Sequence, residues 1–193
     1  AVCDYKTGSP KLSLNEIMEG LSLQLITYLL ALSKTKSTKD LLPAAMMYIY
    51  LHGRLKSISV PPNGIPHAKE KENTNGIFLN DPDVLRTLDS QSGTDDGFIG
   101  VSYVKDGSVK KTSPVLTAEE FEALKALTEK TLIRLYSRLE SGEIAIHPVK
   151  NGTLSPCSYC PYRSICRFDP ALPENSFDYI SKVSDKTIRE KLD

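Results

Sequence analysis

Hydrophobic positions recur at the helical period in two long segments of the chain. Residues 14–33 and 117–141 place an apolar side chain every three or four positions, as an amphipathic helix does. Each segment opens with a capping-box pattern, formed by Ser13 with Glu16 and by Thr117 with Glu120. The pattern predicts one long helix in each segment. The expected apolar face of the second helix consists of Leu124, Leu127, Thr131, Leu135 and Leu139.

Apolar runs and turn residues predict the strands of an α/β fold. Residues 1–5 and 43–51 are rich in strand formers and predict two buried strands, which residues 55–60 are expected to extend into a sheet. The polar stretch 61–76 predicts a loop, and the Asp-Gly turn within 98–111 predicts a hairpin. Two short helices complete the expected elements: residues 81–88, with Pro82 in the first turn, and residues 185–192.

The composition is that of an ordinary globular protein. Of 193 residues, 40% are hydrophobic and 25% are charged, which argues against disorder. The 24 basic and 24 acidic side chains cancel, so the net charge indicates neither a nucleic-acid nor a membrane partner. The longest apolar-rich stretch, residues 21–32, is too short to cross a bilayer, and the N-terminus lacks the basic and apolar regions of a signal peptide. We therefore expect a cytoplasmic, reducing location.

Residues 1–193 are expected to form one domain with two distinct parts. Residues 43–115 form a segment of strand, loop and hairpin, and residues 144–193 form a cysteine-bearing tail. The first predicted strand begins at Ala1 with no lead-in, whereas natural domains seldom begin inside a core strand. We therefore expect a fragment of a longer protein, cut just before that strand. An open sheet edge of this kind could pair with a second copy.

Asp4-Tyr5-Lys6 at the end of the first strand is the first candidate site. Side chains alternate along a strand, so Asp4 and Lys6 point to one side, about 7 Å apart, and Tyr5 points to the other. A carboxylate can hold a hard divalent cation, and a lysine beside it can orient or deprotonate a water or stabilise developing negative charge. A surface ion pair at a strand end is the alternative.

Gln24 and Tyr28 are the second candidate site. They lie four residues apart and therefore share one face of the predicted helix. A glutamine amide beside a tyrosine hydroxyl can bind a phosphate or a base edge, and it can hold a neighbouring lysine. The alternative interpretation is a tyrosine packed in the core with a solvated glutamine.

Three cysteines in the tail form the third candidate site. Cys157, Cys160 and Cys166 follow a C-x2-C-x5-C spacing, and in a reducing compartment cysteines of this kind are ligands rather than disulfides. Three thiolates need a fourth ligand to complete tetrahedral zinc or an iron–sulfur cubane, and the chain has one other cysteine, Cys3. The spacing does not separate zinc from iron, and reduced free thiols remain an alternative.

The other candidates suggest structural roles. Tyr48 and Tyr50 alternate on a predicted strand and are expected in the core and at its edge rather than in a stacking platform. Arg163 and Arg167 beside the cysteines could contact phosphate, although surface arginine is the default. The three histidines stand apart, with no ligand spacing between them, and no Walker-type loop is present.

Taken in order, these motifs resemble a known nuclease family. A strand ending in Asp-x-Lys, followed about 20 residues later by Gln-x-x-x-Tyr on a helix, is similar to the RecB-like branch of the PD-(D/E)XK nucleases. The C-x2-C-x5-C tail resembles its iron–sulfur members. Further stretches resemble the C-terminal nuclease domains of the bacterial AddB subunits of AddAB helicase–nucleases: residues 43–48, 79–85, 105–108 and 156–162.

The resemblance implies a fold, an activity and partners. The fold would be a partial restriction-endonuclease-like mixed sheet flanked by helices, with the cysteine-rich tail. The activity would be Mg²⁺-dependent hydrolysis of DNA phosphodiesters, as an exonuclease on single strands, during recombinational repair of double-strand breaks. The partners would be single-stranded DNA from duplex ends and an AddA-type helicase subunit.

The resemblance also assigns roles to residues. Asp4, where many relatives have Glu, would be a metal ligand with the backbone carbonyl of Tyr5, and Lys6 would be the catalytic lysine. Gln24 and Tyr28 would be the supporting pair near the DNA strand. The three cysteines of the tail would be three of four ligands to a [4Fe–4S] cluster: Cys157, Cys160 and Cys166.

The chain departs from the family pattern in two places. The family's other metal-binding aspartate lies on the strand before Asp4, and its first cluster cysteine lies far upstream, so both would fall outside this chain. Cys3 does not match that cysteine position. We therefore expect the isolated fragment to be inactive or nearly so and its cluster to be incomplete.

Two rival hypotheses remain. The first is another iron–sulfur PD-(D/E)XK nuclease, of the CRISPR-associated type, although such smaller enzymes leave little room for residues 43–115. The second is a non-catalytic DNA-binding or scaffold domain stabilised by iron–sulfur or zinc. A domain without catalysis would have no physical need for the four candidate residues together: Asp4, Lys6, Gln24 and Tyr28.

Overall fold

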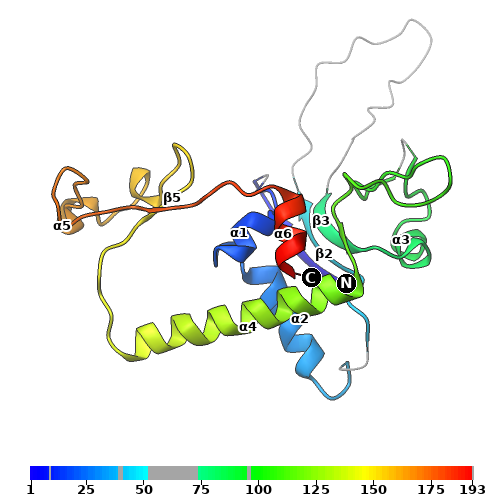
Figure 1. The fold of residues 1–193 in the computed structure, drawn as a ribbon, viewed down its shortest axis with the longest axis horizontal. Coiled ribbons are helices and arrows are strands. Elements are labelled where there is room, and N and C mark those ends of the chain that lie inside the picture. The colour runs from blue at the N-terminus through cyan, green and yellow to red at the C-terminus, as the bar shows by residue number, and fades with distance from the viewer. Residues whose placement is uncertain (9, 39–40, 52–73, 95–96, 193) are drawn as a thin grey trace, which may run out of the picture.

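The chain folds around a four-stranded mixed sheet with the order β1-β2-β3-β4 (Figure 1). The computed structural model describes residues 1–8, 10–38, 41–51, 74–94 and 97–192. Strands β1 (Val2–Lys6) and β2 (Ala45–Tyr50) are parallel, β2 and β3 (Thr74–Leu79) are antiparallel, and β3 and β4 (Val115–Leu116) are parallel. The α/β class expected from the sequence is confirmed.

Helices cover the two faces of the sheet, and each face has its own apolar core. On one face, the sheet packs against α1 (Leu14–Met18), α2 (Gln24–Lys34), α4 (Ala118–Glu140) and α6 (Asp185–Leu192). On the other face it packs against α3 (Pro82–Leu88) and the segment around Ile99 and Val101. Alternation along β2 produces the two cores, since Met46 and Tyr48 belong to the first and Ala45 and Met47 to the second.

The first predicted helix is broken in two, which corrects the sequence prediction. Helix α1 ends at Met18, and α2 begins only at Gln24. Between them, Gly20 and Ser22 adopt left-handed backbone conformations, with φ of 82° and 48°. A right-handed helix cannot continue through such residues, although the hydrophobic period runs across the break.

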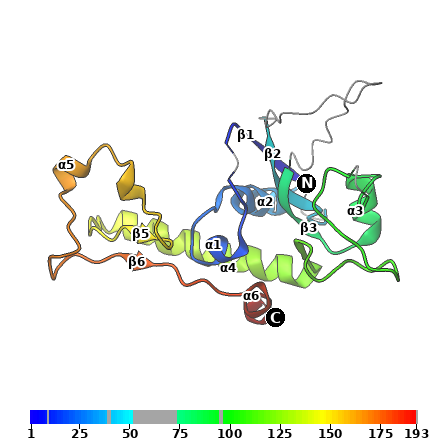
Figure 2. The same ribbon diagram turned by 90° about the horizontal axis from the view of Figure 1, so that it is seen from above.

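The second predicted helix is confirmed as α4. Its capping box is complete, because Thr117 accepts from the Glu120 amide while the Glu120 carboxylate accepts from the Thr117 amide. Gly142 follows it with φ of 72°. The expected apolar face is wrong at its last position, since Leu139 is 78% exposed. This end of α4 extends beyond the sheet and has no core to face (Figures 1 and 2).

Strand β3 was not predicted, because the expected loop 61–76 covers its first residues. The β3 residues of that loop are polar or small, and Gly76 lets the backbone approach β2 closely: a Cβ there would lie 2.6 Å from the Cβ of Met47. The expected strand at residues 55–60 lies outside the described residues. The expected hairpin at 98–111 is present only next to its turn, where Tyr103 and Val109 form one antiparallel bridge and the Val104 amide donates to the Ser108 carbonyl.

The first strand also differs from its prediction as a buried strand. It is the outermost strand of the described sheet, and only Val2 on it is fully buried. Cys3 and Tyr5 face outward and are exposed, whereas Asp4 and Lys6 face the α2 side and are half-buried. The expected alternation of Asp4, Tyr5 and Lys6 is therefore confirmed.

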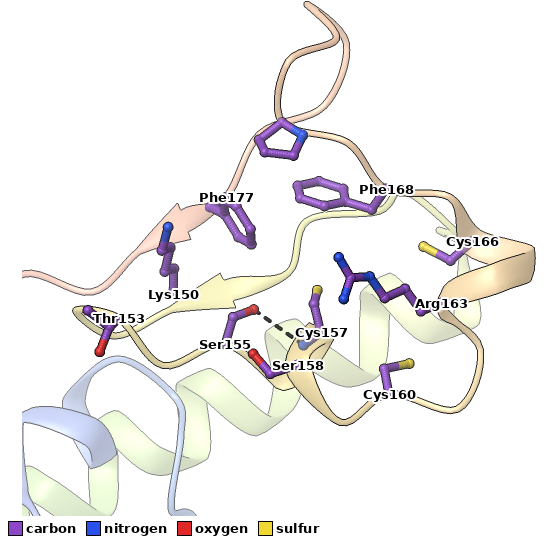
Figure 3. Close-up of a pocket in the computed structure, with 11 residues that line it drawn as sticks. Lys150, Thr153, Ser155, Cys157, Ser158, Cys160, Arg163, Cys166, Phe168 and Phe177 are labelled. Atoms are coloured by element: carbon purple, nitrogen blue, oxygen red, sulfur yellow. Dashed lines mark hydrogen bonds between the residues drawn. The ribbon is translucent and has the colours of Figure 1, made fainter.

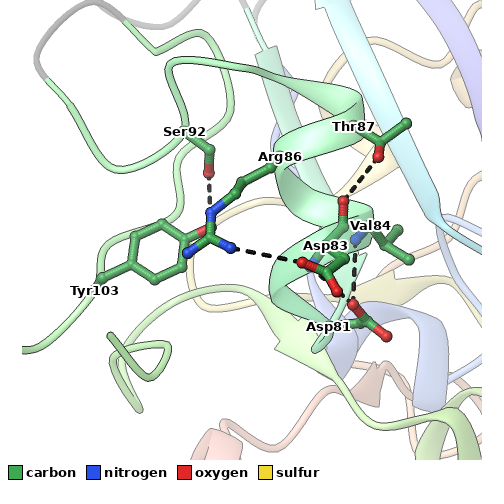
Figure 4. Close-up of polar contacts among 7 residues, drawn as sticks. All are labelled: Asp81, Asp83, Val84, Arg86, Thr87, Ser92 and Tyr103. Carbon is green, nitrogen blue, oxygen red and sulfur yellow. Dashed lines mark hydrogen bonds and ion pairs between the residues drawn. The ribbon is translucent and has the colours of Figure 1, made fainter. Parts of the chain in front are cut away.

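The short helix α3 and the segment after it are fixed by polar contacts. Asp81 caps the helix, because its Oδ1 accepts from the amides of Asp83 at 2.9 Å and Val84 at 3.1 Å. The hydroxyls of Ser92 and Tyr103 are hydrogen-bonded at 3.0 Å, which ties the following segment to the turn (Figure 4). The prediction of this helix with Pro82 in its first turn is confirmed.

The cysteine-bearing tail forms an arm that lies apart from the sheet (Figures 1 and 2). Its base is the parallel pair β5 (Val149–Lys150) and β6 (Asp178–Tyr179). Between them it carries a short 3₁₀ turn, Pro156–Ser158, and one helical turn, α5 (Arg163–Cys166). The chain then returns to the core through the predicted α6, where Ile188 and Leu192 are buried. Among the described residues, no helix is long and apolar enough to span a membrane.

Replacing Gly76 with alanine tests the close contact between β2 and β3. The added methyl would meet the Met47 Cβ and, at 2.8 Å, the Met46 carbonyl oxygen, so overpacking is expected to cost about 1–3 kcal/mol of unfolding free energy. Gly100→Ala is the matched control, since nothing lies within 4 Å of a Cβ there, and it should stay within about 0.5 kcal/mol. Urea unfolding measures both, and equal effects would contradict this packing.

Candidate active site

Strand β1 and helix α2 bring four predicted site residues together. The Lys6 Nζ lies 2.6 Å from Asp4 Oδ2 and donates to Gln24 Oε1 at 3.0 Å. The Gln24 amide nitrogen in turn donates to the Tyr28 hydroxyl at 3.3 Å. Gln24 and Tyr28 share a face of α2 as the spacing predicts, and that face lies over the end of β1. One continuous polar chain therefore links the strand to the helix.

The Asp4 carboxylate combines burial with an incomplete set of partners. Its Oδ2 is buried and accepts no aligned hydrogen bond, so its contact with the Lys6 ammonium is an ion pair. The side chains of Lys6 and Asp4 keep 29% and 24% of their surface, respectively, so water can reach the pair. A buried anionic oxygen with spare acceptor capacity is a favourable ligand for a cation.

Tyr48 is buried in the core, as the sequence predicts, and it also belongs to the site. It sits directly opposite Asp4 in the parallel β1–β2 register, and the Lys6 ammonium lies 5.1 Å from its ring centroid, within cation–π range. Its phenol is nearly buried, and this burial raises the pKa of Tyr48 above its ordinary value. The strand pairing that places Tyr48 here is a long-range feature that the sequence does not state.

The charge state of Lys6 follows from its neighbours. Close contact with the Asp4 carboxylate, whose Oδ2 lies 2.6 Å away, raises the pKa of Lys6 above its ordinary value, and partial desolvation opposes this shift. Lys6 is therefore an ammonium at neutral pH. It can hold an anionic oxygen or orient a water, but it cannot accept a proton until another cation displaces it from Asp4.

Asp4 fits a hard cation as one ligand among several. Its buried, unsatisfied oxygen is the kind of donor that Mg²⁺ takes. Within the described part of the chain, however, no three His, Cys, Asp or Glu side chains gather closely enough to hold a metal ion. Asp4 therefore supplies a single carboxylate ligand, and the described residues hold no complete set of such side-chain ligands around it.

The three cysteines of the tail line one cavity of the arm, of about 310 Å³. Cys157 and Cys160 belong to the 3₁₀ turn and the residues after it, and Cys166 ends α5. The Arg163 side chain lies between Cys157 and Cys166 (Figure 3). The thiols are therefore gathered at one cavity without converging on a single ion. Cys3 lies on β1, away from the arm.

Two aromatic rings line the same cavity as the cysteines, and no motif in the sequence indicates them. The rings of Phe168 and Phe177 meet edge to face with centroids 4.8 Å apart, and both line the cavity. Lys150 stands 4.8 Å from the centroid of the Phe177 ring. Only the pairing of β5 with β6 brings Lys150 to Phe177, 27 positions further along the chain, so local spacing gives no signal for it.

Comparison with known proteins connects this arrangement to nucleases. The family model of the PD-(D/E)XK nuclease superfamily matches residues 1–167. Curated relatives, each named as a subunit of an ATP-dependent helicase/deoxyribonuclease, are 32% identical in Desulforamulus reducens and 33% identical in both Bacillus licheniformis and Clostridium kluyveri. These alignments cover 97–100% of this chain but 17% of each relative. The chain thus spans about a sixth of their length.

Replacing Asp4 with asparagine tests the electrostatics of the site. Without the carboxylate, the pKa of Lys6 should fall back toward its ordinary value. In the wild-type chain the pair stabilises the fold below the ordinary lysine pKa, and this stabilisation is lost as the pH rises through the raised pKa of Lys6. Lysine-selective ¹³C NMR, titrated from roughly pH 9 to 12, follows Lys6 directly. Asp83→Asn, which removes a remote ion pair with Arg86, is the control and should leave the pKa of Lys6 unchanged. An unchanged pKa of Lys6 in Asp4→Asn would refute the pairing of Lys6 with Asp4.

Proposed function

This chain belongs to the PD-(D/E)XK nuclease superfamily, and on that basis we propose that its β1–α2 site hydrolyses phosphodiester bonds of DNA. The observation that carries the proposal is the Lys6 ammonium held between the Asp4 carboxylate and the Gln24–Tyr28 pair. A carboxylate and a lysine on one strand, covered by a polar helix face, can bind a phosphate and direct a water toward it. Residues 1–193 would act as one nuclease domain, with residues 144–193 as its cysteine-bearing part.

Asp4 and the backbone carbonyl of Tyr5 would hold a divalent metal, for which Mg²⁺ is the proposed ion. When bound, such an ion polarises a phosphate and lowers the pKa of its water. The protein's own contribution would come from Lys6, whose ammonium donates to an anionic oxygen or orients the attacking water. Gln24 keeps Lys6 at the end of the strand, because its Oε1 accepts from Nζ.

The exposed residues around Lys6 suit a single DNA strand. Tyr28 is half-exposed and anchored through its hydroxyl to Gln24, so its ring can face a sugar or base. The names of the relatives contain both helicase and deoxyribonuclease. The domain would therefore degrade single strands delivered by an AddA-type helicase subunit, as an exonuclease in recombinational repair of double-strand breaks.

The cysteine cavity would hold a [4Fe–4S] cluster. Cys157, Cys160 and Cys166 would supply three soft thiolate ligands around one cavity, which the rings of Phe168 and Phe177 also line. The spacing of these cysteines alone would also fit zinc, and the likeness of the C-x2-C-x5-C tail to the iron–sulfur members of the family favours the cubane. The fourth ligand would come from elsewhere, as Cys3 lies on β1.

Replacing Lys6 with alanine tests the catalytic proposal. In the intact polypeptide that carries this chain, cleavage of single-stranded DNA with Mg²⁺ should fall by about 10²–10⁴-fold, the usual contribution of a positioned proton-transfer group. Lys11→Ala, at an exposed lysine nearby, should leave the rate unchanged. Cleavage unaffected by Lys6→Ala would reject the proposed active site and favour a non-catalytic DNA-binding domain.

Replacing Cys157 with serine tests the cluster. Anaerobically purified wild-type polypeptide should contain iron and acid-labile sulfide in equal amounts, and the variant should lose most of both, because one thiolate ligand is missing. Cys3→Ser is the matched control, since that cysteine lies outside the cavity. If the wild-type polypeptide instead contained stoichiometric zinc and no acid-labile sulfide, the cluster proposal would be wrong and the cysteines would form a structural zinc site.

A further inference from the structure

The turn between α1 and α2 holds a serine in a conformation that residues with a side chain rarely adopt. Ser22 has φ of 48°, and α2 begins two residues later at Gln24. A Cβ in the left-handed region costs free energy, so neighbouring contacts must hold Ser22 there. Strain of this kind next to a site residue calls for a physical explanation.

Glu16 provides the contacts that hold this turn. The Ser22 hydroxyl donates to Glu16 Oε2 at 2.8 Å, and the Leu21 amide donates to the Glu16 carbonyl at 2.7 Å. Glu16 therefore fixes two consecutive residues of the turn. Helix α2 has no side-chain cap at Leu23, so the direction in which α2 starts depends on the turn itself.

The start of α2 decides where Gln24 stands. Gln24 is the first residue of α2, and its Oε1 accepts from the Lys6 ammonium at 3.0 Å. A hydrogen bond weakens steeply when its angle or length departs from the optimum. A change in the turn at Ser22 would thus shift Gln24, two residues later, and weaken its hydrogen bond with Lys6.

The same glutamate also reaches the cysteine arm. Asn151, directly after β5, donates from Nδ2 to Glu16 Oε1 at 3.3 Å. Asn15, the residue before Glu16 on α1, donates from its side-chain amide to the carbonyl of Ser181 at 3.0 Å. Ser181 lies two residues after β6. Helix α1 therefore holds the arm both where the chain enters it and where the chain leaves it.

We propose that Glu16 is a positioning residue for Lys6, and that Asn151 couples it to the cysteine arm. One carboxylate oxygen clamps Ser22 and so places Gln24 against Lys6, while the other accepts from the arm. Loosening the arm weakens the clamp and releases Lys6. The role of this coupling in catalysis rests on the proposed nuclease function, whereas the positioning itself is measurable without any cleavage.

Glutamine-selective ¹⁵N labelling measures the position of Gln24 directly. The chain contains two glutamines, Gln24 and Gln91, so the side-chain amide spectrum has two NH₂ pairs. Gln91 is exposed and marks the position of a solvated amide. The NH₂ signals of Gln24 should lie away from those of Gln91, because the Gln24 side-chain oxygen binds Lys6 and its nitrogen binds Tyr28. Glu16→Ala should move the Gln24 pair onto the solvated position.

A glycine at position 22 separates positioning from mere packing. Glycine adopts the left-handed conformation freely, so the double variant Glu16→Ala with Ser22→Gly should restore the wild-type Gln24 pair. Glu19→Ala, at an exposed glutamate that follows α1, should leave the spectrum unchanged. A Gln24 pair that stays in place in Glu16→Ala, or that the glycine fails to restore, would overturn the proposal.

The link to the arm has its own test, which also serves if Glu16→Ala does not fold. Asn151→Ala should shift the Gln24 pair part of the way in the wild-type background and not at all in the Ser22→Gly background. Equal shifts in both backgrounds would overturn the coupling. Cleavage that survives Lys6→Ala would reject the nuclease site and leave these spectra unaffected, so the two failures are distinguishable.

Discussion

The ion pair between the Lys6 ammonium and the Asp4 carboxylate is the interaction around which the site is arranged. Both side chains are only partly exposed, at 29% and 24% of their surface, so the two charges gain from further polar partners. The ammonium finds Gln24 Oε1 and the Tyr48 ring, and both must stay close to the end of β1. The packing of α2 over β1, through Leu25, Ile26 and Leu29, and the pairing of β2 with β1 bring these partners to the ion pair. One Asp4 oxygen still has acceptor capacity, and that is where we propose the metal binds.

The cysteine-bearing arm has too little buried apolar surface to fold alone. Its two short strands bury none of their own residues fully, and an isolated two-stranded unit is marginal in water. The three thiols and the pair of phenylalanine rings around one cavity supply a centre in place of a core. A bound cluster would stabilise the arm, and the contacts of α1 with Asn151 and Ser181 would pass that stability on to the sheet.

The sequence predicted the parts of the site that depend on local spacing. The alternation of Asp4 and Lys6 and the shared helix face of Gln24 and Tyr28 follow from periods of two and 3.6 residues. Strand formers predicted β2, Pro82 in the first turn predicted α3, and the apolar period with its capping box predicted α4. Whether these residues carry the proposed roles is a question for the variants. What the spacing could not reveal depends on long-range or backbone features. The register of β1 with β2 places Tyr48 in the site. Strand β3 can pair closely with β2 because Gly76 has no side chain.

The broken first helix shows the same limit in another form. The apolar period continues across residues 19–23, so the pattern predicts a single helix. The hydrogen bond from Ser22 to Glu16 and the left-handed Gly20 end it instead. This break is what lets α2 start at Gln24, beside Lys6. The break at residues 20–22, which the apolar pattern places inside a helix, is thus what positions Gln24 in the site.

Manganese-induced NMR line broadening tests the central claim, that Asp4 and Lys6 mark where this chain meets a metal ion and a phosphate. Mn²⁺ binds the same hard oxygen ligands as Mg²⁺ and broadens only nearby signals. The backbone amides of Asp4 and Tyr5 and the side-chain amide of Gln24 should broaden first, and Asp4→Asn should abolish this broadening. Broadening that begins elsewhere, or that persists unchanged in Asp4→Asn, would contradict it.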